Sequence, residues 1–260
     1  MKKVISVFLV IMLFTALASL NSYANFGQTY TAPKGTPEID GQIDSIWDAA
    51  EWTDVDQPYD GADRSDVPES LRVKLLWDEE HLYVLAEVKD LDLNYDNDLV
   101  EVYLDETNQR GGAYDDYSSQ TRFRWDGSVI EDSGTNCQND ADGAGVKTDD
   151  GWILEISLKW TSGTASEGQV CGLEFMFNIG DSSSDFTSAL RWNVDTAGGE
   201  DLPFRDNTNW GVLTLGAAPA VAETSPDQSQ EQAPQTMDIL VPTLLSLAAA
   251  AGIVIQKKRR

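Results

Sequence analysis

The stretch that decides the fold is LRVKLLWDEEHLYVLAEVKD at residues 71–90, together with LVEVYLDE at 99–106. Apolar side chains occupy every second position in three successive runs: Leu71, Val73, Leu75 and Trp77; Leu82, Val84, Ala86 and Val88; and Val100, Val102 and Leu104. A period of two places such residues on one face of an extended chain. The pattern therefore predicts half-buried antiparallel strands separated by turns.

Similar patterns recur through the middle of the chain. They predict further strands at 119–125, 145–149, 151–159, 170–179, 188–193 and 210–215. One short helical turn is expected at Ile43, Ile46 and Trp47, with Asp40 or Asp44 as its cap, and no longer amphipathic helix is visible. Many short strands with frequent turns indicate an all-β fold, a two-sheet antiparallel β-sandwich of jelly-roll type.

Two further segments carry a family resemblance. Together with the strand block, PEIDGQIDSIWDAAEW at 37–52 and GWILEISLKW at 151–160 resemble the family 9 carbohydrate-binding module, a β-sandwich of secreted glycan-degrading proteins. The resemblance spans roughly residues 29 to 215. It implies non-catalytic binding of a glycan or polysaccharide. A structural or protein-docking envelope module is the main alternative.

Composition divides the chain into four parts. Residues 1–24 carry two lysines, an apolar run and a small-residue cleavage pattern, which predict a secretory signal peptide. The sandwich is expected at 25–216, and the Pro-, Ala- and Gln-rich segment 217–236 is expected to be a disordered linker. Residues 237–260 combine an apolar run with a basic tail, which fits a transmembrane anchor or a degenerate sorting signal. We therefore expect an extracellular protein attached to the cell surface.

The charge balance narrows the choice of partner. The chain has a formal net charge of -26. Nucleic acid and anionic lipid surfaces would be repelled by such a field, so neither is expected as a partner. A neutral ligand or a cation suits it better, although solubility in a salty medium also accounts for heavy acidity.

Sugar recognition makes a definite physical demand, which four residues could meet. A sugar ring packs its flat C–H face on an aromatic side chain, and its hydroxyls need carboxylate, amide or guanidinium partners. Glu101 and Arg122 are expected on the free face of one sheet, and the resemblance implies that they hold the terminal sugar. The family places tryptophans where this chain offers Tyr95 and Phe204 as ring-stacking residues. The plainer alternatives are a solvated ion pair and loop packing.

The two cysteines, Cys137 and Cys171, both lie in the exported part. Export to an oxidising surface permits a disulfide between them, which would stabilise the fold by about 3 to 4 kcal/mol. Two reduced, buried thiols are the alternative. Zinc is not expected, because His81 is distant and the ligand spacing does not fit.

Calcium is a possible structural cofactor, because the resemblance implies it and three acidic loops, 90–98, 105–116 and 139–145, offer oxygen ligands. Haem is not expected, since His81 and Met176 are the only candidate His and Met ligands in the sandwich and nothing places them together. An enzyme is not expected either. The many acids give no distinguishing pair for a glycoside hydrolase, and no nucleophile motif surrounds His81.

Overall fold

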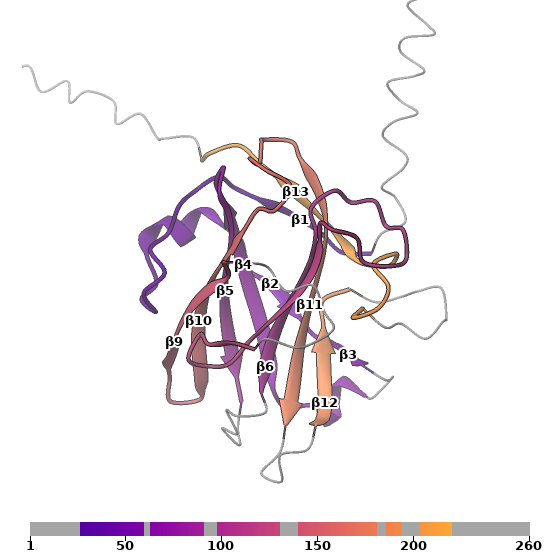
Figure 1. Cartoon of the computed structure of the whole chain (residues 1–260). Coiled ribbons are helices and arrows are strands. Elements are labelled where there is room, and N and C mark those ends of the chain that lie inside the picture. The colour runs from indigo at the N-terminus through magenta and orange to yellow at the C-terminus, as the bar shows by residue number, and fades with distance from the viewer. Residues whose placement is uncertain are drawn as a thin grey trace, which may run out of the picture. The chain divides into compact units, whose positions relative to one another are not determined.

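Two β-sheets packed face to face form the structure (Figure 1), which is a computed structural model that describes residues 27–59, 63–90, 98–130, 140–180, 186–193 and 203–219. The larger sheet contains β1 (Thr29–Ala32), β3 (Gln57–Pro58), β6 (Leu99–Asp105), β7 (Ser118–Phe123), β8 (Val129–Ile130), β11 (Val170–Gly180), β12 (Phe186–Arg191) and β13 (Gly211–Leu215). The smaller sheet contains β2 (Thr53–Val55), β4 (Ser70–Trp77), β5 (His81–Lys89), β9 (Asp142–Lys147) and β10 (Gly151–Lys159). Two 3-10 turns, η1 (Ser45–Ala49) and η3 (Arg64–Asp66), complete the described elements.

The strand order brings distant segments together. The larger sheet runs β1-β13-β11-β6-β7-β8, with β12 beside the second half of β11 and β3 beside β12. The smaller sheet runs β2-β4-β5-β10-β9. Every described pair is antiparallel except β1 with β13, which is parallel. The predicted two-sheet sandwich is confirmed, with that one parallel pair as a departure.

The core lies between the sheets and is built from the alternating residues of the sequence. Val73, Leu75, Val84, Val102 and Leu104 are all fully buried there. Burying such a side chain contributes about 1.5–3 kcal/mol, so the alternation supplies the main driving force for folding. The tryptophans in register with it are buried as well: Trp77, Trp152 and Trp160.

The outer face of the smaller sheet is partly covered by η1. Trp47 is fully buried there, and its Nε1 donates to the Glu155 carboxylate at 2.9 Å. Burial raises the pKa of Glu155. The predicted helical turn is confirmed as a 3-10 turn with Asp44 at its N-cap position. The Asp44 side chain makes no capping hydrogen bond, because its carboxylate accepts from the backbone N–H of Glu38 at 2.8 Å.

Four strands have no counterpart among the predicted ranges. β1, β2, β3 and β8 have only two to four residues each, too few for a visible alternation. Within the described ranges, no helix is long and apolar enough to cross a membrane. The predicted signal peptide and C-terminal anchor, and the linker beyond residue 219, lie outside the described residues.

Candidate functional site

One row of side chains crosses the outer face of the larger sheet, from β3 to β8. Directly paired residues of neighbouring strands point to the same face. The register gives this row as Gln57, Arg191, Met176, Glu101, Arg122 and Ile130. A carboxylate and two guanidinium groups therefore share one face of the sheet.

Glu101 lies at the centre of this face. Its Oε2 accepts from the Tyr103 hydroxyl and from Gln120 Nε2, the latter at 2.6 Å, and its Oε1 accepts from Asn178 Nδ2. Glu101 points away from the core as predicted, but it is only 3% exposed rather than open, because these neighbours surround it. The carboxylate is consequently held in one orientation.

Arg122 occupies the position on β7 directly opposite Glu101, so the expected pairing of acid and base on one face is present. Its side chain is half-buried, unlike that of Glu101. The guanidinium thus lies nearer the surface than the carboxylate. Their role in ligand binding stays a prediction.

Two buried polar atoms near Glu101 lack a hydrogen-bond partner in the described part of the chain. They are Gln120 Oε1 and Trp210 Nε1. An unpaired buried polar atom costs about 1–3 kcal/mol. Such an acceptor and such a donor are the kind of group that a hydroxylated ligand satisfies.

An aromatic cluster lies on the same face. The Trp210 ring meets Tyr103 edge-on with centroids 5.6 Å apart, and meets Tyr114 in the same way at 5.4 Å. Tyr59 and Phe204 are partly buried against this cluster. The predicted residue Phe204 is therefore within the cluster, whereas Tyr95 lies outside the described residues.

Loops from two parts of the chain meet at this cluster. The Tyr114 hydroxyl donates to the Pro203 carbonyl at 2.8 Å, and the Gly112 N–H donates to Asn207 Oδ1 at 3.0 Å. Burial, with the nearby Glu101 charge, raises the pKa of Tyr114. Trp210 directly precedes β13, although the sequence predicted a strand that begins at this residue.

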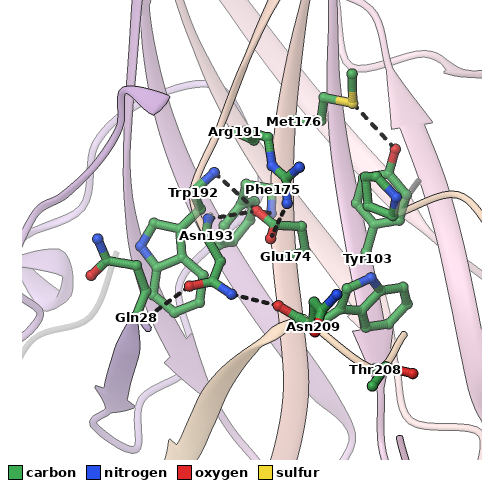
Figure 2. A network of polar contacts seen from close by, with 12 residues as sticks. Gln28, Tyr103, Glu174, Phe175, Met176, Arg191, Trp192, Asn193, Thr208 and Asn209 are labelled. Carbon is green, nitrogen blue, oxygen red and sulfur yellow. Dashed lines mark hydrogen bonds and ion pairs between the residues drawn. The ribbon is translucent and has the colours of Figure 1, made fainter. Parts of the chain in front are cut away.

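A buried acid supports the sheet next to the row, as Figure 2 shows. Glu174 Oε1 accepts from the backbone N–H groups of Phe175, Trp192 and Asn193 at 2.9–3.0 Å. Arg191 Nη2 lies 3.8 Å from Glu174 Oε2. Burial raises the pKa of Glu174 to about 8, although Arg191 and the three amides oppose the rise. Sequence patterns did not indicate this acid as special.

Comparison with known proteins adds the family. Residues 39–218 match the family described as "Carbohydrate family 9 binding domain-like". The chain belongs to this family. A family 9 carbohydrate-binding module from Caldicellulosiruptor kristjanssonii in complex with cellotriose has a TM-score of 0.63 and 26% identity, over 76% of this chain and all of that one. The family 9 module from Caldicellulosiruptor kristjanssonii in complex with glucose has a TM-score of 0.63 and 25% identity, over 75% of this chain and all of that one.

Curated relatives match the family 9 domain within much longer proteins. Exoglucanase XynX of Acetivibrio thermocellus is 32% identical over 74% of this chain and 18% of its own length. Endo-1,4-beta-xylanase A of Thermotoga neapolitana is 34% identical over 71% of this chain and 17% of its own. This chain therefore spans less than a fifth of either relative.

Cys171 of the family 9 domain is a free, fully buried thiol in this structure, 3.5 Å from the Glu106 carbonyl that accepts from its Sγ. Burial raises its pKa to about 12. Cys137 lies outside the described residues, so the disulfide stays a prediction that the structure does not show.

Calcium ligands are not assembled in the described part of the family 9 domain, where no group of three or more His, Cys, Asp or Glu side chains could hold a metal ion. In the loop 105–116, the Asp105 carboxylate accepts from the N–H groups of Thr107 and Arg110 at 3.1 and 3.2 Å. The residues there do not fit a metal. Most of the loop 90–98 lies outside the described residues, and calcium stays a prediction there.

Proposed function

We propose that the outer face of the larger sheet binds a carbohydrate without chemically changing it. The observation that carries this proposal is the Glu101–Arg122 pair, set beside an aromatic cluster in a chain of the carbohydrate-binding family 9. The combination meets both demands of a sugar: a ring to pack on and charged partners for its hydroxyls.

Each group has a distinct part in the proposed binding. An ionised carboxylate offers about four lone-pair sites, and three protein donors already use the Glu101 carboxylate, so about one site is left for a sugar hydroxyl. Gln120 Oε1 accepts a second hydroxyl proton, and Arg122 donates to hydroxyl oxygens. The Phe204 ring receives the flat face of the sugar.

We propose a glucose-based oligosaccharide as the ligand class to test first. The Caldicellulosiruptor modules hold cellotriose and glucose, and the curated relatives are an exoglucanase and xylanases. A neutral chain also suits a protein with a net charge of -26, because it has no charge to be repelled.

We further propose that this chain supplies binding rather than catalysis. The curated relatives are named as enzymes, but the match covers only their family 9 part. We therefore expect substitutions at Glu101 and Arg122 to weaken sugar binding, and we expect the wild-type protein itself to release no sugar. Incubation of purified protein with cellulose and xylan, followed by an assay for reducing sugar, tests this. Steady release of sugar would contradict it.

The cellular setting belongs to the same proposal. An apolar leader and an apolar, basic C-terminal segment support an extracellular module that is tethered to the cell surface through a Pro- and Gln-rich stalk. Protease treatment of intact cells, with detection of the sandwich, tests this. Full protection from protease would contradict surface exposure.

The binding experiment is calorimetric titration of the protein with cellotriose and glucose, with and without calcium. We expect heat of binding that saturates for at least one of these sugars. If neither binds, and a wider glycan array is also negative, the protein-docking module becomes the better proposal.

A further inference from the structure

A hollow of about 190 Å³ opens on the outer face of the smaller sheet. It is lined by Asp54 of β2, by Ser70, Leu71 and Arg72 of β4, and by Glu87 and Lys89 of β5. The register places Asp54 opposite Arg72 and Arg72 opposite Glu87, and Ser70 opposite Lys89. The charged side chains therefore alternate in sign across three neighbouring strands.

Arg72 is held in place by an aromatic ring. Its guanidinium lies 4.4 Å from the centroid of Trp52, and its Nη2 donates to Glu87 Oε2 at 2.7 Å. Lys74 lies over the same ring at 5.1 Å and donates to the Trp47 carbonyl at 2.8 Å. A stacked and bonded guanidinium loses less freedom when a ligand binds, because its orientation is already fixed.

The hydrogen-bonding capacity around this hollow is largely unused. A guanidinium carries five N–H donors, and in the described part of the chain Arg72 pairs only one of them. The Asp54 carboxylate and the Ser70 hydroxyl have no hydrogen bond or ion pair among the residues that the structure describes, and Glu87 uses one oxygen. Lys89 is the exception, because its Nζ lies 3.2 Å from the Asp150 carboxylate. The other lining groups thus face one small space with hydrogen-bonding capacity that the protein leaves unused.

Charge and size define the ligand. Two carboxylates and two cations line the hollow, so its own charges cancel although the whole chain stands at -26. The volume equals that of about six water molecules, below the range of pockets for drug-sized ligands. A small, uncharged ligand with several hydroxyl groups matches both properties.

We propose that this hollow is a second binding site, which takes a single sugar unit or a similar polyhydroxylated ring. Asp54 and Glu87 accept from its hydroxyls, while Arg72 donates to them. The site lies on the smaller sheet, and Glu101 lies on the outer face of the other sheet, so the two sites do not share a residue. The second site therefore does not depend on the first.

A purely structural role makes a different prediction. Arg72 and Glu87 form a half-exposed ion pair, which contributes about 0–1 kcal/mol to stability. If that were its whole purpose, Arg72→Gln would shift the melting temperature slightly and no sugar would perturb the region. Ligand-induced changes at Arg72 and Trp52 separate the two cases.

The test is a nuclear magnetic resonance titration of the whole chain with glucose, which follows the Arg72 Nε–H and the Trp52 indole N–H. We expect both signals to shift in a saturable manner in the wild type and equally in Glu101→Gln. Asp54→Asn and Arg72→Gln should each remove the effect. Lys159→Gln is the matched control, because Lys159 forms an exposed ion pair with Asp140 on the same sheet.

The outcomes divide cleanly. Signals that do not move, or that move with glycine as a dipolar probe but not with glucose, overturn the second site. The Gln120 and Trp210 side-chain signals report on the first site in the same spectra, so failure of the proposed function is seen separately. Thermal melts of each variant exclude unfolding, and Asp54→Asn is the mildest change should Arg72→Gln lose the fold.

Discussion

Gln120 and Glu101 are joined by a hydrogen bond of 2.6 Å from the Gln120 amide nitrogen to the Glu101 carboxylate. The same amide has its oxygen buried with no partner among the described residues. The Gln120 amide nitrogen is therefore used in a hydrogen bond within the protein, whereas the amide oxygen remains available as an acceptor. In the proposed binding mode, this oxygen and the Glu101 carboxylate are the acceptors for the hydroxyl groups of the sugar.

Replacement of Glu101 by glutamine should remove most binding at the proposed site. Three donors point at this carboxylate, and a glutamine would turn one of its two acceptor oxygens into a donor facing them. We expect at least a tenfold loss of affinity for cellotriose, together with a loss of about 1–3 kcal/mol in the free energy of unfolding. Calorimetry and chemical denaturation measure the two effects.

The control for this variant is Glu167→Gln, which changes an exposed carboxylate in the loop before β11. It should alter neither quantity. If Glu101→Gln binds cellotriose as tightly as the wild type, the site is misplaced even though the fold is right.

Arg122 should matter for binding more than for stability. Its side chain is half-buried, so its truncation exposes little of the core. The ligand, however, loses the planar set of N–H donors of the guanidinium, which a lysine cannot reproduce. We expect Arg122→Met and Arg122→Lys each to weaken binding several-fold with nearly unchanged melting temperatures. Lys159→Met, which removes an exposed cation from β10 of the smaller sheet, is the matched control. Equal loss in Arg122→Met and in the control, with Arg122→Lys unchanged, would point to net charge rather than to this site.

The sequence predicted the fold because its information is local. The alternating apolar residues Val100, Val102 and Leu104, for example, indicate both a strand and the face of it that is buried. It also placed Glu101 and Arg122 on a common outer face, since both point opposite to core residues. The pairing of their strands then brought them side by side.

The environment of that pair could not be predicted, because it depends on contacts between segments far apart in sequence. Asn178 reaches Glu101 from a strand 77 positions away. Trp210 packs against Tyr103 and Met176, which belong to strands far away in the sequence. Burial of Glu101 and the fixed orientation of Gln120 follow from these long-range contacts and not from any local motif.

Phe204 offers a change expected to strengthen binding. The family resemblance places a tryptophan at this position, and a larger ring covers more of a sugar face. We expect Phe204→Trp to raise the affinity for cellotriose and Phe204→Ala to lower it, each several-fold. Calorimetric titration gives both values, and the Tyr117→Ala variant controls for loss of an exposed ring elsewhere. If both Phe204 variants bind cellotriose with wild-type affinity, this ring is not part of the site.

Glu174 should make the stability of the domain depend on pH in a defined direction. Burial raises its pKa from about 4.5 to about 8, so the folded protein holds this proton more tightly than the unfolded chain does. The stabilising contribution is therefore full below about pH 4.5, falls as the pH rises, and is lost once the pH passes about 8.

The variant Glu174→Gln is uncharged at every pH and can keep its oxygen on the three backbone N–H donors. Its free energy of unfolding, measured by denaturation at several pH values, should fall less steeply than that of the wild type between about pH 5 and 8. Arg191→Met removes the nearby cation, which should raise the Glu174 pKa further and move the fall to higher pH. Parallel profiles for wild type and Glu174→Gln would show that this carboxyl titrates at its ordinary pKa in the folded protein.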